Sequence, residues 1–347
     1  MSATQPFTVG LIQEAVSPDV SANLNDAITK IREAHARGAQ IVCLQELFNC
    51  QYFCKAQKGE RFELAEPIPG PTVTTLQALA KDLEIVLIVP IFERQAAGVY
   101  RNSAAVIDAD GSLLGVYRKM HIPDDPLFNE KYYFTPGDAT QDERYTLKGA
   151  SNGWRVWNTR YASIGVLICW DQWYPEAARI TSLLGADILF YPTAIGWHPS
   201  EKAEFGEDQV TAWRTIQRAH AIANGVYVAS PNRVGFEPEP GTNGLEFFGH
   251  SFISDPFGRI VAEAGVDPAV LVATCDPRVI EDTRRNWPFL RDRRIDAYGP
   301  ILTATSADRG EVSLSGRVGA ARRDLDRVAA PRAGLARQAR ADPVGIR

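Results

Sequence analysis

This 347-residue sequence has no long apolar run, no basic surplus and no targeting segment. No apolar stretch approaches the roughly 20 residues that a membrane-spanning helix needs. The first residues contain neither a basic head nor an apolar segment, so we expect no secretory signal. Acidic residues outnumber lysine and arginine by 42 to 37, whereas nucleic-acid-binding proteins normally carry a basic surplus. The composition therefore predicts a cytoplasmic protein with neither a nucleic-acid nor a membrane partner.

Cysteine and histidine are too scattered for a disulfide framework or a metal centre. The sequence has five of each, and an odd number of cysteines spread over a long chain fits a reducing compartment. Cys50 and Cys54 form the closest pair, but no second pair of Cys or His completes a tetrahedral zinc site. We therefore expect no metal site. The five cysteines are Cys43, Cys50, Cys54, Cys169 and Cys275.

Segments with helical apolar spacing alternate with short, continuously apolar segments from Phe7 to about residue 302. Continuously apolar strands indicate sheets covered on both faces, as in helix-flanked α/β proteins. Asp110-Gly111 predicts a hairpin turn between strands 103–108 and 113–119. The other predicted strands are 7–13, 41–44, 85–91, 162–169, 188–191, 226–229, 252–254, 260–263 and 270–274, and the predicted helices are 21–37, 74–83, 174–184 and 208–223.

The composition changes at about Thr303. From there to Arg347 the chain has no aromatic residue, cysteine or lysine, and it carries nine arginines against five acids. Little apolar surface is available to anchor a helix in this segment. We interpret residues 1–302 as one domain and residues 303–347 as an Ala/Arg-rich, poorly ordered tail; a partner-binding tail is the alternative.

Three reactive side chains follow predicted strands. Glu46 comes just after strand 41–44, Lys119 ends strand 113–119, and Cys169 ends strand 162–169. In an open α/β sheet, ligands bind outside the carboxyl ends of the strands. Each residue alone has a plain structural explanation; a buried cysteine, for instance, behaves as a small hydrophobe. Their shared placement predicts one site that combines a carboxylate, an ammonium and a thiol.

The segment after Cys169 strengthens this prediction. A helix is expected to open at Pro175, because proline is favoured in a first helical turn. The thiol would then lie at a strand-to-helix turn, near free backbone N–H groups. Such donors are expected to lower the pKa of the Cys169 thiol and to bind an oxyanion.

The longer motifs around these residues are recognisable. FTVGLIQ in the first strand, LQE around Glu46, YRKMHIPDD around Lys119 and ICWDQWYPEAAR around Cys169 resemble the nitrilase superfamily of carbon–nitrogen hydrolases. NEKYYFTPGD, which contains Glu130, is similar to the superfamily segment with a second glutamate. The resemblance runs from Phe7 to Ile301 and implies an α/β fold, a four-layer αββα sandwich of two mixed sheets. It also implies a homodimer or larger homo-oligomer that needs no cofactor.

The resemblance further implies a cysteine-dependent amidohydrolase. Cys169 would be the nucleophile, and Glu46 would take its proton and later protonate the departing nitrogen. Lys119 and the backbone N–H of Trp170 would stabilise the oxyanion. Glu130 would orient Lys119 or the substrate amide.

The residues that follow Cys169 bear on the substrate. Relatives that act on carbamoyl or amidated acids carry Arg or His there, which can hold a carboxylate. Here the sequence is Asp171-Gln172-Trp173; Arg179 is the first basic residue downstream, and Arg233 is an alternative carboxylate ligand. The CWDQW and PTAIG segments most resemble members that hydrolyse N-carbamoylputrescine to putrescine, carbon dioxide and ammonia. A carbamoyl amine is therefore the predicted substrate.

The cationic tail of a carbamoyl amine needs carboxylates and aromatic faces. Acids in the segment 201–208 have a second explanation, because the helix dipole favours acids at a solvated helix start. Asp124-Asp125 departs from the Asp-Gly expected after His-Ile-Pro, which leaves the accepted chain length open. The predicted contacts are Tyr52, Asp124, Asp125, Trp173, Trp197, Glu201, Glu204 and Glu207.

Three alternatives remain open at this point. A β-ureidopropionase or N-carbamoyl-amino-acid hydrolase would need an arginine for the substrate carboxylate. A nitrilase or general aliphatic amidase would accept a neutral substrate. A binding protein that keeps the fold without catalysis is disfavoured, because a glutamate, a lysine and a cysteine are all present at strand ends.

Overall fold

The computed structural model describes residues 4–138 and 153–302, so the predicted tail, residues 303–347, lies outside the described residues. The chain divides into two compact units after Asp292. Within the described ranges, the second unit contains two short 3-10 turns, Ile295–Ala297 and Gly299–Leu302. The sheets and α-helices belong to the first unit. In the part of the chain that the structure describes, no helix is long and apolar enough to cross a membrane.

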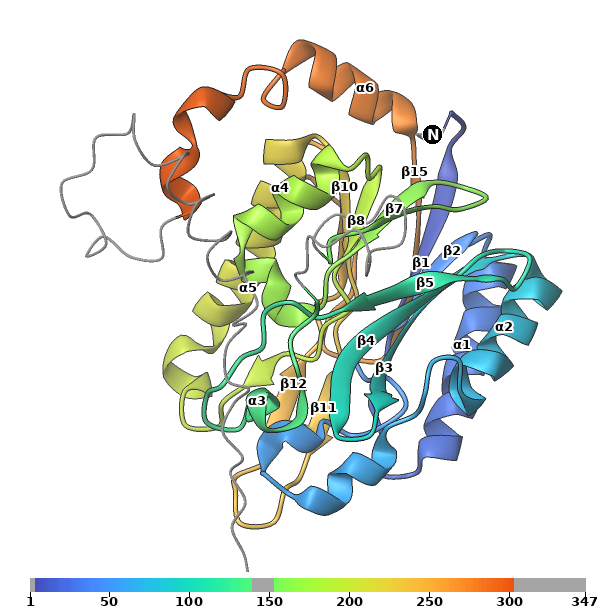
Figure 1. Ribbon diagram of the computed structural model, residues 1–347, viewed down its shortest axis with the longest axis vertical. Helices are drawn as coiled ribbons and strands as arrows, with labels where there is room; N and C mark the ends of the chain where they lie inside the picture. The colour runs from blue at the N-terminus through green and yellow to red at the C-terminus, as the bar shows by residue number, and fades with distance from the viewer. Residues whose placement is uncertain (1–3, 139–152, 303–347) are drawn as a thin grey trace, which may run out of the picture. The chain divides into compact units, whose positions relative to one another are not determined.

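One sheet has six strands in the order β15-β1-β2-β3-β4-β5. Strands β1, β2 and β3 are parallel and are connected through helices, while β15, β4 and β5 add antiparallel neighbours. Helices α1 and α2 cover its outer face (Figure 1). The elements are β1 Phe7–Gln13, α1 Val20–Ala36, β2 Ile41–Cys43, α2 Pro71–Leu83, β3 Val86–Ala96, β4 Val99–Ile107, β5 Leu113–Arg118 and β15 Ala269–Cys275.

A second six-stranded sheet has the order β14-β13-β10-β8-β7-β6. Its central strands β7, β8 and β10 are parallel, and the outer strands are antiparallel to their neighbours. Helices α4 and α5 belong to this half (Figure 1). The elements are β6 Val156–Asn158, β7 Ser163–Val166, α4 Pro175–Leu183, β8 Ile188–Phe190, α5 Lys202–Asn224, β10 Tyr227–Ser230, β13 Phe252–Ser254 and β14 Ile260–Glu263.

Smaller elements complete the first unit. A three-stranded sheet has the order β11-β12-β9. Its strands lie in the connections between strands of the second sheet, with β9 after β8 and with β11 and β12 between β10 and β13. The 3-10 helix Cys169–Trp173 lies between β7 and α4. The remaining elements are η1 Phe53–Lys55, η2 Gly59–Leu64, α3 Glu130–Tyr133, β9 Gly196–Trp197, β11 Val234–Glu237, β12 Leu245–Phe248 and α6 Pro277–Asn286.

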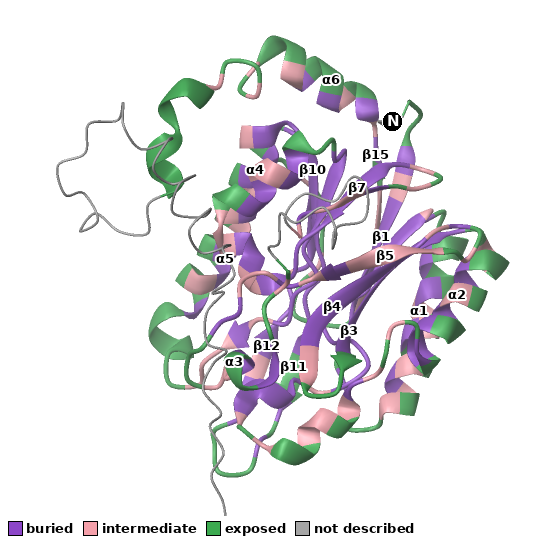
Figure 2. Ribbon diagram, in the orientation of Figure 1, coloured by how far each residue is buried: buried purple, intermediate pink, exposed green. Residues whose placement is uncertain are grey.

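The main core lies between the two large sheets. Val9 and Ile88 of the first sheet and Ile164 and Ile188 of the second belong to one buried apolar cluster (Figure 2). Ala177 of α4 joins the same cluster, whereas a separate cluster packs α1 and α2 against the first sheet. Burial on both faces explains why the strands read as continuously apolar. The predicted αββα sandwich is confirmed.

Several boundaries differ from those predicted, among them the starts of α2, β4 and α5 and the ends of β3 and β7. Helix α5 begins at Lys202, six residues before the predicted start at Asp208. Its first turns carry mainly exposed polar side chains and therefore show no apolar periodicity. Strand β7 ends at Val166 rather than at Cys169, although the N–H of Cys169 still donates to the carbonyl of Pro192 at 2.9 Å.

Candidate active site

The structure brings Glu46, Lys119 and Cys169 together at the carboxyl ends of β2, β5 and β7. Each side chain follows the end of its strand by three residues or fewer, and all three residues are buried, at 0%, 1% and 5% exposure. Lys119 Nζ donates to Glu46 Oε1 at 2.9 Å. The charges of Glu46 and Lys119 both act on the thiol of Cys169. The carboxyl ends of β2 and β5 in one sheet and of β7 in the other therefore deliver the carboxylate, the ammonium and the thiol to one edge of the sandwich.

Neighbouring strands hold the carboxylate of Glu46 through both of its oxygens. Oε1 accepts a hydrogen bond from Asn102 Nδ2 at 2.6 Å as well as from Lys119. Oε2 accepts from the backbone N–H of Ala194 at 2.8 Å. Asn102 lies on β4, and Ala194 follows β8 of the other sheet. Contacts from both sheets thus fix one orientation of this carboxylate in the site.

Lys119 lies between two buried carboxylates. Its Nζ donates to Glu130 Oε2 at 2.7 Å, and the hydroxyl of Tyr52 donates to Glu130 Oε1 at 2.7 Å. Burial by itself lowers the pKa of Lys119, but the carboxylates of Glu130 and Glu46 outweigh burial and raise this pKa well above its ordinary value. Burial raises the pKa of Glu130 from 4.5 to about 7, although Lys119 acts in the opposite direction. The site therefore keeps a charged ammonium beside Glu46.

Cys169 occupies a strained turn, with a φ of 44° that is uncommon for residues other than glycine. The expectation of a lowered thiol pKa is wrong. Burial, and next the carboxylate of Glu46, raise the pKa of Cys169 well above its ordinary value. The apolar surroundings disfavour the thiolate, and the N–H of Cys169 itself donates to Pro192 rather than to the site. A thiol of this kind needs a neighbouring base before it can act as a nucleophile.

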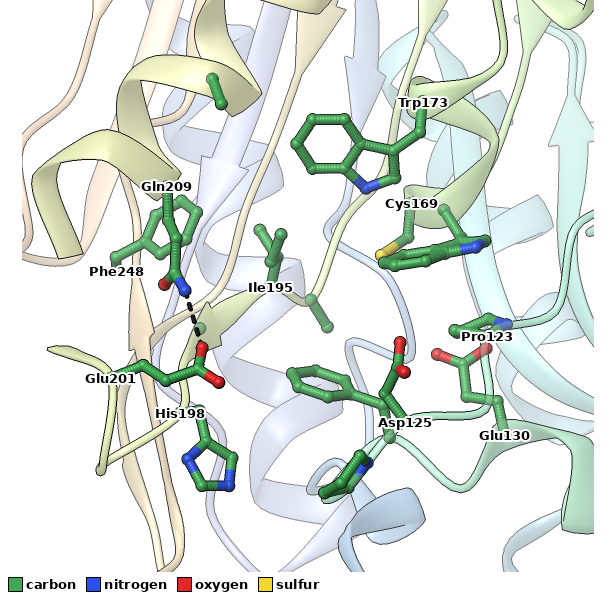
Figure 3. Close-up of a pocket in the computed structure, with 16 residues that line it drawn as sticks. Pro123, Asp125, Glu130, Cys169, Trp173, Ile195, His198, Glu201, Gln209 and Phe248 are labelled. Atoms are coloured by element: carbon green, nitrogen blue, oxygen red, sulfur yellow. Dashed lines mark hydrogen bonds between the residues drawn. The ribbon is translucent and has the colours of Figure 1, made fainter. Parts of the chain in front are cut away.

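Cys169 and Glu130 line a cavity of about 610 Å³ (Figure 3). A cavity of this volume is in the usual range for small-molecule sites. Its walls are mainly apolar and aromatic, which suits an aliphatic chain or a cation. The aromatic lining residues are Phe128, Trp170, Trp173 and Phe248.

The charged groups that line the cavity are carboxylates. Asp125 and Glu201, both exposed, join the buried Glu130, whereas no lysine or arginine occurs among the described lining residues. The carboxylate of Glu201 accepts a hydrogen bond from Gln209 Nε2 at 2.9 Å (Figure 3). The described lining therefore favours a ligand with a positive charge.

Among residues 4–138 and 153–302, no group of three or more His, Cys, Asp or Glu is arranged to hold a metal ion.

Of the predicted substrate contacts, Asp125, Trp173 and Glu201 line the cavity, and the other five do not. Tyr52 is fully buried, and its hydroxyl donates a hydrogen bond to Glu130. The indole of Trp197 donates to the carbonyl of Gly206 and lies under the ammonium of Lys202. The remaining three carboxylates are exposed to solvent and do not line the cavity. They are Asp124, in a loop, and Glu204 and Glu207, on α5.

Arg233 is not available to hold a substrate carboxylate. Its side chain is fully buried and paired with Glu237. Its Nη2 donates to three carbonyl oxygens, those of Glu46, Leu47 and Cys50. The alternative prediction, that Arg233 holds a substrate carboxylate, is therefore wrong. This residue supports the turn that carries Glu46. Sequence patterns gave no signal for this contact, or for the contact of Asn102 with Glu46, because both join distant parts of the chain.

The indole N–H of Trp173 is a donor without a partner. Trp173 lines the cavity, and its Nε1 atom is buried and makes no hydrogen bond within the described structure. Figure 3 shows the indole above Cys169, with its nitrogen directed toward the cavity. A buried, unsatisfied donor is costly, so its position next to Cys169 suits a hydrogen bond to a bound ligand.

The model of the carbon–nitrogen hydrolase family matches residues 8–285. The chain belongs to this family. It is 48% identical over 301 residues to N-carbamoylputrescine amidase of Solanum lycopersicum, covering 85% of this chain and 95% of that one. It is 41% identical to citrullinase of Francisella tularensis, covering 85% and 97%. The crystal structure of a carbon–nitrogen hydrolase from Helicobacter pylori superposes with a TM-score of 0.80 at 41% identity, covering 86% and 99%.

Proposed function

We propose that the protein hydrolyses the ureido C–N bond of N-carbamoylputrescine, giving putrescine, carbon dioxide and ammonia. The observation that carries this proposal is the cavity beside Cys169, where the described lining has carboxylates and aromatic faces but no lysine or arginine. Carboxylates and aromatic faces both attract the ammonium at the distal end of this substrate. The 48% identity to the Solanum lycopersicum amidase supports the same substrate.

In this proposal Cys169 attacks the ureido carbon and Glu46 is the general base. The raised pKa of Cys169 means that the resting group is a thiol, so Glu46 takes its proton as the carbon–sulfur bond forms. Glu46 returns that proton to the departing nitrogen as the C–N bond breaks. Water, deprotonated by Glu46, then releases carbamate from sulfur and restores the thiol. Carbamate decomposes to carbon dioxide and ammonia.

Lys119 and the backbone N–H of Trp170 stabilise the oxyanion of each tetrahedral intermediate in the same proposal. Lys119 suits this role because its ammonium is buried and held between Glu46 and Glu130. Glu130, fixed by Tyr52, orients Lys119. The chemistry is supplied by side chains and backbone, with no cofactor.

Carbamoyl acids are the principal alternative substrates. Citrulline and N-carbamoyl-β-alanine both place a carboxylate at the end of the molecule away from the ureido group, and citrulline carries an ammonium beside it. This carboxylate would meet Asp125 and Glu201 without a lining lysine or arginine among the described residues to compensate. Like charges at short distance are unfavourable in such a site. The cavity therefore favours a carbamoyl amine.

The test is a comparison of kcat/KM for N-carbamoylputrescine, citrulline, N-carbamoyl-β-alanine and the neutral analogue N-carbamoylbutylamine. We expect N-carbamoylputrescine to be hydrolysed with the highest kcat/KM. An equal or higher value for any of the other three would contradict the substrate assignment. Cys169→Ala is expected to abolish turnover of every substrate, and retained turnover would overturn the mechanism.

We also propose that the protein forms a homodimer or larger homo-oligomer in the cytoplasm. Large apolar side chains on the second half of the domain support association, because exposed apolar surface often marks an interface. Examples are Leu183 and Leu184 at the end of α4 and Ile222 on α5. Sedimentation analysis tests the assembly, with a monomer at micromolar concentration as the contrary outcome, and cell fractionation tests the compartment.

A further inference from the structure

Asp171, two residues after Cys169, is a fully buried carboxylate that the chemistry above does not use. Its Oδ2 accepts hydrogen bonds from the N–H of Ile168 at 2.9 Å and from the hydroxyl of Tyr117 at 2.7 Å. Its Oδ1 accepts from the N–H of His121 at 3.0 Å and lies 2.7 Å from His121 Nδ1. A buried carboxylate is costly unless its oxygens are satisfied in this way.

The partners of Asp171 are the neighbours of the two reactive residues. Ile168 directly precedes Cys169, while Tyr117 and His121 lie two residues before and two residues after Lys119. Lys119 is thus held between two anchors on the same carboxylate, Tyr117 on β5 and His121 after the bend that follows it. One side chain therefore links the strand end that carries the ammonium to the turn that carries the thiol.

The surrounding contacts stiffen this link. The ring of His121 stacks on Tyr174, which follows the Cys169 turn, with centroids 3.7 Å apart and planes 4° apart. Burial, and next the carboxylate of Asp171, raise the pKa of Tyr117, so its hydroxyl stays protonated and remains a donor. Both contacts restrain the anchors on either side of Lys119.

We propose that Asp171 is a positioning residue that sets the placement of the Cys169 thiol relative to the Lys119 ammonium, given the roles proposed above for these two residues. Cys169 has a left-handed backbone conformation, which persists only where the surrounding structure over-determines it. The bond from Ile168 N–H to Asp171 closes the turn at the residue before Cys169. Asp171 thereby holds both the strained turn and the strand end.

Asp171→Asn tests this assignment, because an amide replaces one accepting oxygen with a donor that faces other donors. We expect kcat to fall about 100-fold while KM stays within about threefold, as for misplaced groups that act in the transition state. The matched control is Asp255→Asn. Asp255 is also buried, and its carboxylate accepts from the N–H groups of Phe257 and Arg259 in the β13–β14 turn. This control is expected to keep the wild-type kcat.

Alkylation of Cys169 by iodoacetamide, followed by peptide mass spectrometry, provides a readout that does not depend on the substrate. We expect slower alkylation in Asp171→Asn than in Asp255→Asn. If Asp171→Asn does not fold, Tyr117→Phe takes its place, with an expected loss of about tenfold in kcat for one missing hydrogen bond to a carboxylate.

The proposal is overturned if the tested Asp171 or Tyr117 variant matches Asp255→Asn in kcat and in alkylation rate, or if its loss lies in KM alone. Turnover by Cys169→Ala would instead overturn the proposed function, so the two failures are distinguishable.

Discussion

Arg233 Nη2 donates to the carbonyl oxygen of Glu46 at 3.0 Å, although 187 residues separate the two in sequence. The same nitrogen donates to the carbonyls of Leu47 at 2.8 Å and Cys50 at 3.1 Å. Leu47 has a φ of 51°, so the chain reverses sharply just after Glu46. One buried guanidinium therefore satisfies the carbonyls of the turn that presents Glu46 to the site, and Glu237 neutralises its charge.

Arg233→Met is expected to lower both stability and activity. The substitution removes one hydrogen bond from each of three carbonyl oxygens of the turn. It also breaks a buried ion pair, which costs about 3 kcal/mol or more in the free energy of unfolding. The backbone of Glu46 loses its anchor, so kcat falls as well. Urea unfolding and steady-state kinetics measure the two effects. Arg259→Met is the control, because it removes an exposed arginine from its ion pair with Asp255. Equal behaviour of the two variants would argue against the role of Arg233.

Asp125→Asn and Glu201→Gln are expected to weaken the preference for a cationic substrate. Each change removes a negative charge from the cavity lining and lowers kcat/KM for N-carbamoylputrescine about tenfold. Neutral N-carbamoylbutylamine has no ammonium to lose and changes little. Asp208→Asn serves as the control, because Asp208 is exposed and lies outside the lining on α5, the helix that follows Glu201. Equal losses for both substrates would show that these carboxylates do not bind the amine.

Trp173→Phe is expected to separate activity from stability. Loss of the indole N–H removes a donor to the bound substrate, which lowers kcat/KM by up to about tenfold. The free energy of unfolding is unchanged or higher, because the variant no longer buries an unsatisfied donor. Kinetics and chemical unfolding of the same preparation test both parts. Unchanged kcat/KM would mean that the N–H does not bind the substrate.

The raised pKa of Glu130 predicts a pH dependence of stability. Between pH 4.5 and about 7 the folded protein binds a proton at Glu130 that the unfolded chain releases. The contribution of Glu130 to the free energy of unfolding therefore falls as the pH rises through this window, by up to about 3 kcal/mol. The Glu130→Gln variant has no group that titrates at this position. Its free energy of unfolding therefore rises relative to that of the wild type as the pH increases over the same range. Parallel curves of unfolding free energy against pH would contradict the prediction.

The order of helices α1, α2, α4 and α5 and of the strands of the two large sheets except β6 could be predicted from the sequence, because buried strands are short apolar runs separated by amphipathic helices. The short strands β6, β9, β11 and β12 and the helices α3 and α6 were not predicted. The β4–β5 hairpin follows directly from Asp110-Gly111. The first turns of α5 were missed, since an exposed helix start with acidic residues carries no apolar period. Glu201, just before the helix, lines the cavity. Glu204 and Glu207, within the helix, do not line it.

The sequence by itself determined the family and the three side chains at the strand ends, because those depend on local pattern and on motifs that are contiguous in the chain. Only the tertiary structure decided the electrostatics of the site. The pKa of the Cys169 thiol is raised rather than lowered, since burial is a property of the packed sandwich and outweighs the nearby donors. Likewise, Arg233 supports Glu46 instead of facing a substrate, and Asp171 links two strands, because these contacts join residues that no sequence spacing relates.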